Sequence, residues 1–92
     1  MTREGWSQLR DTLTDKLAEV EHERWSHWQR YMHSKGTRLP DGSLVLPADL
    51  VARWDRQIDT RFQDLTENEK ESDREQVRKY LPLIEAAIAS IP

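Results

Sequence analysis

Residues 21–33, with the sequence EHERWSHWQRYMH, concentrate side chains that are suited to chemistry. The stretch carries three aromatic rings, three imidazoles and two guanidinium groups. Rings and cations in such a mixture can pack in a core, hold a metal ion, or bind a ligand by stacking and charge. Each use needs a different spacing along a helix, so the spacing separates the three interpretations.

The histidine spacing argues against a metal site. His22 and His27 are five residues apart, which puts them about 140° apart around a helix, whereas two zinc ligands on one helix face are four residues apart. Glu19 and His22 form one Glu-x-x-His element of a di-iron bundle, but the sequence has no second one. The chain also lacks cysteine and a nucleophile elbow, so we expect no metal, no cofactor and no enzymatic activity.

Charged residues interrupt two apolar helix faces. On the first predicted helix, Glu21 and Arg24 fall inside the arc that the apolar residues define. On the last one, steps of three and four residues back from the apolar stripe reach three charged positions: Lys70, Asp73 and Arg74. Because a buried charge needs a partner, two hypotheses stay open. The groups pair with one another, or the cations bind the phosphates of a ligand near a helix N-terminus.

The tryptophans offer a surface for stacking. Trp25 lies at the edge of the apolar arc with His22 further round, so its ring could be half covered and half available to a purine base. Stacking with support from arginine is worth on the order of 1–3 kcal/mol per base. Trp28 and Trp54 are further candidates. A tryptophan at helical spacing is more often part of a core, and that alternative remains open.

Composition narrows the class of protein. The chain has 92 residues, 36% of them apolar and 34% charged, which is typical of a single α-rich domain with a modest core. Its net charge of −3 disfavours binding to nucleic-acid polymers. No segment has the length or hydrophobicity of a signal peptide or a membrane span. We therefore expect a cytoplasmic protein that does not enter a membrane.

Local signals then define the elements. Apolar periodicity predicts a helix over about residues 7–33, with a second cap at Thr14 leaving open a break near Leu13. That helix should end near Gly36 in a left-handed turn. Residues 40–42, Pro-Asp-Gly, predict a tight turn within residues 37–46, either as a small hairpin or as a loop.

Two further helices follow. The first starts at Pro47 and should bury four apolar residues: Leu50, Val51, Trp54 and Ile58. The second begins with a capping box formed by Thr66 and Glu69, and its stripe consists of Val77, Tyr80, Leu81 and Ile84. Pro82 should kink this helix. The predicted fold is therefore a compact, mostly α domain of three to four helices, with a loop or β-hairpin between the first two.

Two segments together resemble the ryanodine receptor repeat (RyR) domain. They are residues 21–25, His-Glu-Arg-Trp preceded by glutamate, and residues 62–74, FQDLTENEKESDR. The family has a His-Glu-x-Trp element on a long helix and a later helix that opens with Leu-Ser/Thr-x-x-Glu-Lys-x-x-Asp-Arg. The resemblance covers residues 17–84 of a single domain spanning 1–92, with residues 1–16 as a helical extension and 85–92 as a helical tail. The Gly-Trp-x-Tyr-Gly element of the receptor repeats is absent from residues 34–38.

The resemblance implies binding of a small nucleotide ligand that contains adenine, such as a cyclic nucleotide or an ADP-ribose derivative. Trp25 would then be the stacking ring, and His22 and Glu23 would shape the pocket. Lys70, Asp73 and Arg74 would form its ionic edge. A short stand-alone member encoded by a phage would act in the host cytoplasm as a sponge for a second messenger of antiviral defence.

The alternative is a helical adaptor that binds another protein and uses its charged residues only as a structural ion-pair network. In either case we expect a homo-oligomer, because the stripe from Trp6 to Val20 and the tail from Ile84 to Ile91 are more apolar than so small a domain can cover.

Overall fold

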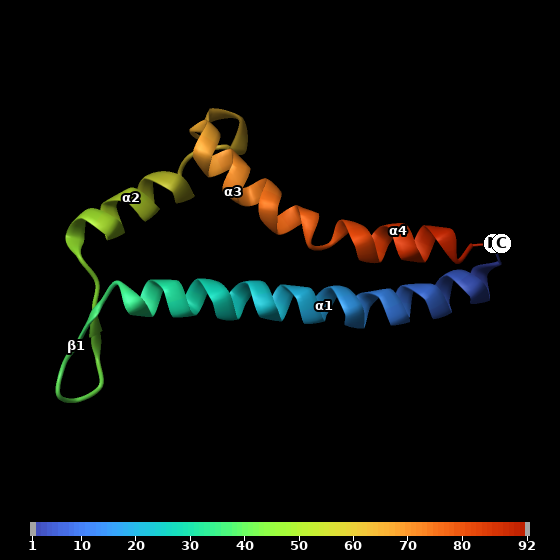
Figure 1. Cartoon of the computed structure of the whole chain (residues 1–92), viewed down its shortest axis with the longest axis horizontal. Helices are drawn as coiled ribbons and strands as arrows, with labels where there is room; N and C mark the ends of the chain where they lie inside the picture. The colour runs from blue at the N-terminus through green and yellow to red at the C-terminus, as the bar shows by residue number, and fades with distance from the viewer. Residues whose placement is uncertain (1, 92) are drawn as a thin grey trace.

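The computed structural model describes residues 2–91, so the predicted domain limits at 1 and 92 fall outside the described residues. Its elements, in chain order, are α1 (Arg3–Ser34), β1 (Thr37–Arg38), β2 (Leu44–Val45), α2 (Ala48–Ile58), the 3-10 turn η1 (Phe62–Asp64), α3 (Glu67–Arg78) and α4 (Leu81–Ala89). The predicted α-rich class, with a hairpin between the first two helices, is confirmed (Figure 1).

α1 is a single uninterrupted helix of 32 residues. It begins earlier than predicted because the Thr2 hydroxyl caps it, accepting a hydrogen bond from the Gly5 N–H at 2.9 Å. Thr14 does not start a second helix, since its hydroxyl donates to the Arg10 carbonyl at 2.7 Å inside the helix. The open question of a break near Leu13 is therefore settled in favour of one helix.

The segment after α1 is a hairpin in which Thr37 pairs with Val45 and Arg38 with Leu44. Its turn relies on Gly42, whose φ is 90°, and on the Asp41 carboxylate, which accepts the Ser43 N–H at 2.8 Å. That hydrogen bond also lowers the pKa of Asp41. The proposed tight turn is thus confirmed as a hairpin rather than a loop.

Gly36 serves a different purpose from the one predicted. Gly42 is the one residue with positive φ among residues 2–91, so Gly36 does not form a left-handed helix end. Instead it lies so close to the hairpin that an added Cβ would be 2.6 Å from Leu44 Cγ and 3.1 Å from the Val45 carbonyl oxygen. Glycine is required here by close packing rather than by the backbone angle.

The helices in the second half of the chain begin where predicted, but their apolar residues are more exposed than predicted. α3 begins at the Thr66–Glu69 capping box, which confirms that signal. α2 does not bury its whole apolar stripe, because Ile58 is 78% exposed. Near Pro82 the chain divides into two helices instead of kinking: the Tyr80 N–H donates to the Val77 carbonyl at 2.9 Å, and α4 begins at Leu81 with the proline in its first turn.

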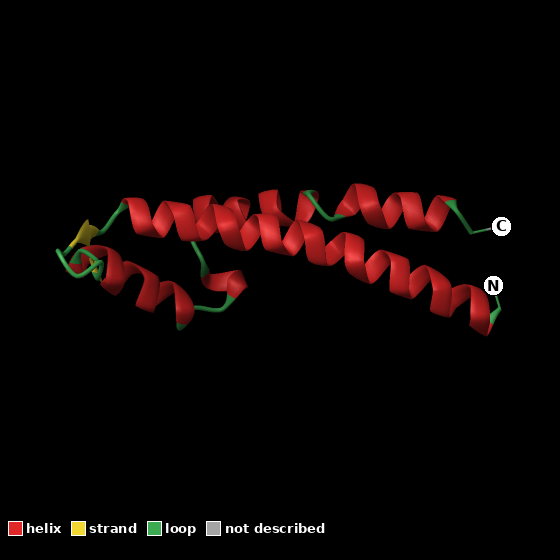
Figure 2. Cartoon of the chain, turned by 90° about the horizontal axis from the view of Figure 1, so that it is seen from below, coloured by secondary structure: helices red, strands yellow, loops and turns green. Residues whose placement is uncertain are grey.

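The helices form an open arrangement. α4 runs back along the first half of α1, so the end of α4 lies beside the start of α1, while α2 and α3 diverge from the second half of α1 (Figures 1 and 2). The radius of gyration is 18.4 Å, against about 12 Å for a closed domain of this length. None of residues 2–91 is fully buried. The apolar faces are therefore half covered by one protomer alone.

Substitution of Gly36 by alanine tests the packing of the hairpin on the end of α1. The new methyl group would overlap Leu44, and overpacking of this kind costs about 1–3 kcal/mol. We expect urea unfolding to show such a loss for Gly36→Ala, and a much smaller effect of the same substitution in a Leu44→Ala background. Equal losses in both backgrounds would contradict the proposed contact.

Candidate functional site

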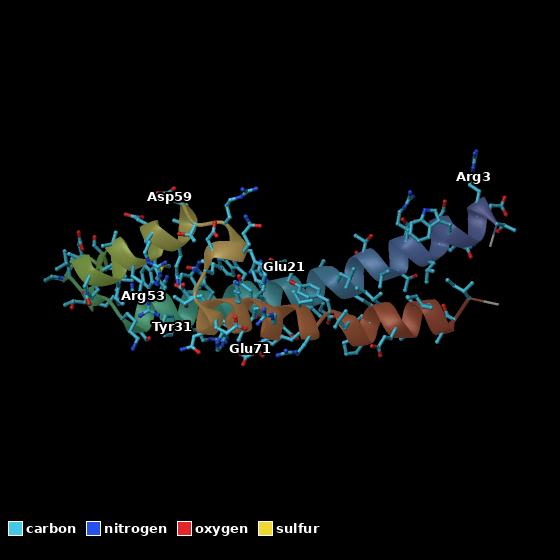
Figure 3. The ribbon with its side chains drawn as sticks, turned by 90° about the horizontal axis from the view of Figure 1, so that it is seen from above. Arg3, Glu21, Tyr31, Arg53, Asp59 and Glu71 are labelled. Atoms are coloured by element: carbon cyan, nitrogen blue, oxygen red, sulfur yellow. The ribbon has the colours of Figure 1, made fainter. Side chains whose placement is uncertain are left out.

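Glu21 and Arg24 of α1 lie opposite the end of α3 and line a cleft. The α1–α3 cleft, as we call it, has a volume of about 250 Å³ and six lining residues: Glu21, Arg24, Asp73, Gln76, Val77 and Tyr80. Tyr80 belongs to the junction between α3 and α4. Figure 3 shows Glu21 and Glu71 on opposite sides of the α3 ribbon.

A hydrogen-bonded triad forms one wall of this cleft. Arg24 donates to both carboxylate oxygens of Glu21, with Nε at 3.2 Å from Oε2, and the Tyr80 hydroxyl donates to the same carboxylate across 59 residues of sequence. The arginine and then the phenol lower the pKa of Glu21. The carboxylate in turn raises the pKa of Tyr80 and of Arg24. These two charges on the apolar arc are thus paired internally.

Trp25 does not itself line the cleft, but it is close in the helix to a residue that does. It follows Glu21 by four residues, so the two side chains are neighbours on the surface of α1. Its ring is 55% exposed and stacks on His22, with ring centroids 6.0 Å apart and an interplanar angle of 19°. The indole therefore contacts the His22 ring and remains largely exposed. Glu23 is exposed and hydrogen-bonds to no other side chain within residues 2–91.

Trp28 and Trp54 lie apart from the cleft and join two helices. Their rings pack edge to face at 5.3 Å between centroids, linking α1 to α2, and Trp28 also stacks on Tyr31 at 5.8 Å. Half-covered rings that contact each other in this way act mainly as packing. For this pair the structure favours the packing alternative over a base-stacking surface.

Of the two predicted cations near the start of α3, Arg74 has carboxylate partners on its own helix and Lys70 does not. Arg74 pairs with Glu67 at 2.7 Å and with Glu71 at 3.3 Å, and Glu67 and then Glu71 raise the pKa of Arg74. Lys70 forms no ion pair within the described part of the chain. Its Nζ lies 6.0 Å from the centre of the Phe62 ring, and Cζ of Arg74 lies 5.9 Å from the same ring centre. Of these residues, Lys70 alone is a cation without a carboxylate partner.

The nine predicted site residues therefore do not form one pocket. Arg24 and Asp73 line the cleft, and His22 and Trp25 stack on each other on the same helix as Arg24. The other five do not line it: Glu23, Trp28, Trp54, Lys70 and Arg74. Four residues that line the cleft are not among the nine: Glu21, Gln76, Val77 and Tyr80. Tyr80 had been counted only as an apolar member of a stripe, and its hydroxyl was the signal that could have identified it.

Glu69 is the residue that fixes the start of α3, the helix that supplies Asp73 and Gln76. Its carboxylate accepts the Thr66 N–H at 3.0 Å and also accepts hydrogen bonds from Gln57 and Arg56 of α2, the latter at 2.5 Å. Its side chain is 15% exposed. Gln57 first, then the Thr66 backbone, lower the pKa of Glu69 from 4.5 to about 2.

Comparisons of this chain with protein-family models, with curated proteins and with solved structures found no match. The similarity of residues 17–84 to the RyR domain thus remains a prediction. Within residues 2–91, no helix has the length and apolar character needed to cross a membrane. The same residues contain no cluster of three His, Cys, Asp or Glu side chains placed to hold a metal ion.

The low pKa of Glu69 predicts an acid-dependent loss of stability. The folded state binds this proton less readily than the unfolded state, so the contribution is present above the unfolded value of about 4.3 and disappears as the pH falls through about 2. We expect the melting-temperature difference between wild type and Glu69→Gln to be largest near pH 7 and to shrink below pH about 4.5.

Glu75→Gln is the matched control for that experiment, because Glu75 lies exposed on the same helix and forms no hydrogen bond to another described side chain. Its melting temperature should stay close to that of wild type over the same pH range. A Glu69→Gln difference that does not depend on pH would contradict the account.

Proposed function

We propose that this protein binds a small nucleotide-type ligand at the α1–α3 cleft without converting it chemically. The observation that carries the proposal is the exposed Trp25 residue, one helical turn after Glu21, which lines a cleft that holds both hydrogen-bond donors and acceptors. A flat ring beside a small polar cleft suits a purine stacked on the indole with its edge or sugar in the cleft. The volume of about 250 Å³ fits part of such a ligand.

The charges of the cleft indicate which part of the ligand each residue would contact. Glu21 and Asp73 outnumber Arg24, so the cleft repels phosphate and favours groups that donate hydrogen bonds. Asp73 accepts no hydrogen bond from a described side chain, and a free carboxylate is the usual partner of ribose hydroxyls. Gln76 can donate to the base. Phosphates would lie outside the cleft, nearer Lys70.

A protein that only binds a nucleotide signal can act by sequestering it. A binder requires no proton shuttle, and an abundant cytoplasmic copy that holds a nucleotide signal would lower the free concentration of that signal. This is the sponge that the resemblance to RyR domains implies. The same site in a host protein would instead sense the signal.

Ligand-dependent melting tests this proposal. A panel of adenine nucleotides, cyclic dinucleotides and trinucleotides, and ADP-ribose derivatives should contain a member that raises the melting temperature, by mass action equivalent to about 2.7 kcal/mol at a hundredfold excess over Kd. The shift should be lost in Trp25→Ala and Asp73→Asn. Chromatography should recover the ligand unchanged.

Trp6→Ala is the matched control, because Trp6 is also an exposed tryptophan of α1, at 50%, and does not line the cleft. This variant should keep the full ligand shift relative to its own melting temperature. If no panel member shifts wild type, or if Trp25→Ala keeps the shift, the proposed site is wrong.

One set of observations favours the adaptor alternative. Arg24 and Arg74 are already neutralised by carboxylates, as expected for a structural network, and large apolar side chains remain exposed on α4. An adaptor would bind protein rather than nucleotide. A wild-type protein that ignores the whole ligand panel but keeps its stability would favour this function.

A further inference from the structure

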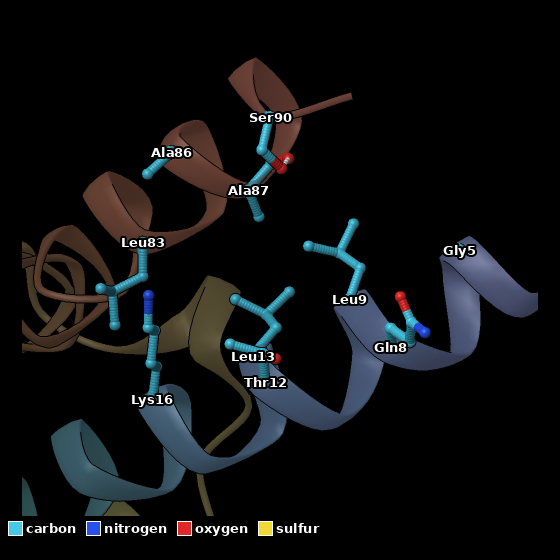
Figure 4. A pocket seen from close by; sticks show the side chains of 10 residues that line it. All are labelled: Gly5, Gln8, Leu9, Thr12, Leu13, Lys16, Leu83, Ala86, Ala87 and Ser90. Atoms are coloured by element: carbon cyan, nitrogen blue, oxygen red, sulfur yellow. Dashed lines mark hydrogen bonds between the residues drawn. The ribbon is translucent and has the colours of Figure 1, made fainter. Parts of the chain in front are cut away.

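The groove between the first half of α1 and α4 is apolar and open. Leu9 and Leu13 of α1 face Leu83 and Ala87 of α4 across a space of about 430 Å³ (Figure 4). The polar residues that line it are small or long and flexible: Gln8, Thr12, Lys16 and Ser90. The amino group of Lys16 ends a long aliphatic stem, which can reach water while the stem covers apolar neighbours.

α4 has the composition of a helix that is covered on more than one side. Its sequence, LPLIEAAIA, contains one charged residue, Glu85. A helix that is apolar nearly all round belongs inside a bundle. In one protomer, however, α4 packs mainly against α1 and the end of α3, which leaves Ile88 62% exposed and Leu81 43% exposed. At least one more helix is needed to cover it.

The exposed area measures how much cover is missing. The protomer exposes 7514 Å², and a folded monomer of 10.9 kDa exposes about 5,600 Å². The excess is roughly 1,900 Å² for each chain, which corresponds to a dimer interface in the range of about 2,000–5,000 Å² total that obligate homodimers bury. A transient partner would bury less surface than this, and the apolar faces of the free protomer would stay exposed between encounters.

We infer that a second copy of this chain covers the α1–α4 groove, so that two α1–α4 pairs form a four-helix bundle around a two-fold axis. α1 and α4 run antiparallel, and two such pairs placed face to face have the arrangement of an ordinary bundle. The same apolar groove is then presented by both partners, as a two-fold interface requires. The α1–α3 cleft stays outside this contact.

The mass of the protein in solution tests this inference. Sedimentation equilibrium of the full chain between 0.1 and 100 µM, a range of about a thousandfold chosen to span ordinary dimer affinities, should give twice the monomer mass of 10.9 kDa. The melting temperature should rise with protein concentration, because dissociation accompanies unfolding. A wild-type chain that is monomeric throughout and melts at the same temperature at every concentration overturns the inference and leaves the groove to another protein.

Ala87→Glu locates the contact, and Ala52→Glu is its matched control. Ala87 lines the groove, whereas Ala52 is an exposed residue of α2. We expect Ala87→Glu to shift the protein to monomer with at least a hundredfold weaker association, and Ala52→Glu to remain dimeric. A dimeric Ala87→Glu, or loss of the dimer in Ala52→Glu instead, contradicts the proposed surface. If Ala87→Glu unfolds, the wild-type mass and concentration dependence decide.

Discussion

The carboxylate of Glu69 is the interaction on which the second half of the structure depends. It receives the backbone N–H of Thr66, which starts α3, and side-chain hydrogen bonds from Gln57 and Arg56, which hold α2 against that start. One group thus sets both where α3 begins and where it points. Since Asp73 lies one turn further along α3, the position of the cleft wall follows from this contact. A glutamate at the third position of a helix has an ordinary capping role, and here that role also joins two helices.

In the α1–α4 pair, at the other end of the molecule, stability is limited by apolar surface that stays exposed rather than by charge. α1 is much longer than α4, and a single antiparallel neighbour covers one side of each helix. No residue in 2–91 reaches full burial as a result. A chain of this size gains little from half-covered leucines to offset the conformational entropy of folding, so closure by the proposed second copy would also stabilise the fold. The ligand proposal is independent of that closure, because the cleft lies along the middle of α1.

The sequence predicted local features well and contacts between distant residues less well. The capping box at Thr66 and the turn at Gly42 depend on residues within a few positions of one another. Near Pro82 only a kink was predicted, whereas the chain divides there into two helices. The role predicted for Gly36, a left-handed helix end, was wrong. Its close contact with Leu44 depends on how the hairpin folds back on α1. Ile58 was expected to be covered, but no neighbouring element reaches it.

The candidate site shows the same division. Of the charged positions that periodicity placed on apolar faces, Glu21, Arg24 and Asp73 line one cleft, whereas Lys70 and Arg74 do not. Periodicity could not identify the partners: Arg24 pairs within α1, and the hydrogen bond that Glu21 accepts from the second half of the chain comes from Tyr80. Hydrogen bonds between side chains far apart in sequence depend on the approach of whole helices, which no local pattern encodes.

A double-mutant cycle between Gln57 and Glu69 tests the central claim most directly. Urea unfolding of wild type, Gln57→Ala, Glu69→Ala and the double variant separates their mutual interaction from their individual contributions. The structure predicts that the double variant loses clearly less stability than the two single losses added together, because either substitution alone already breaks the link between α2 and α3. Strictly additive losses would mean that the two side chains do not interact, and that something other than Glu69 positions α3.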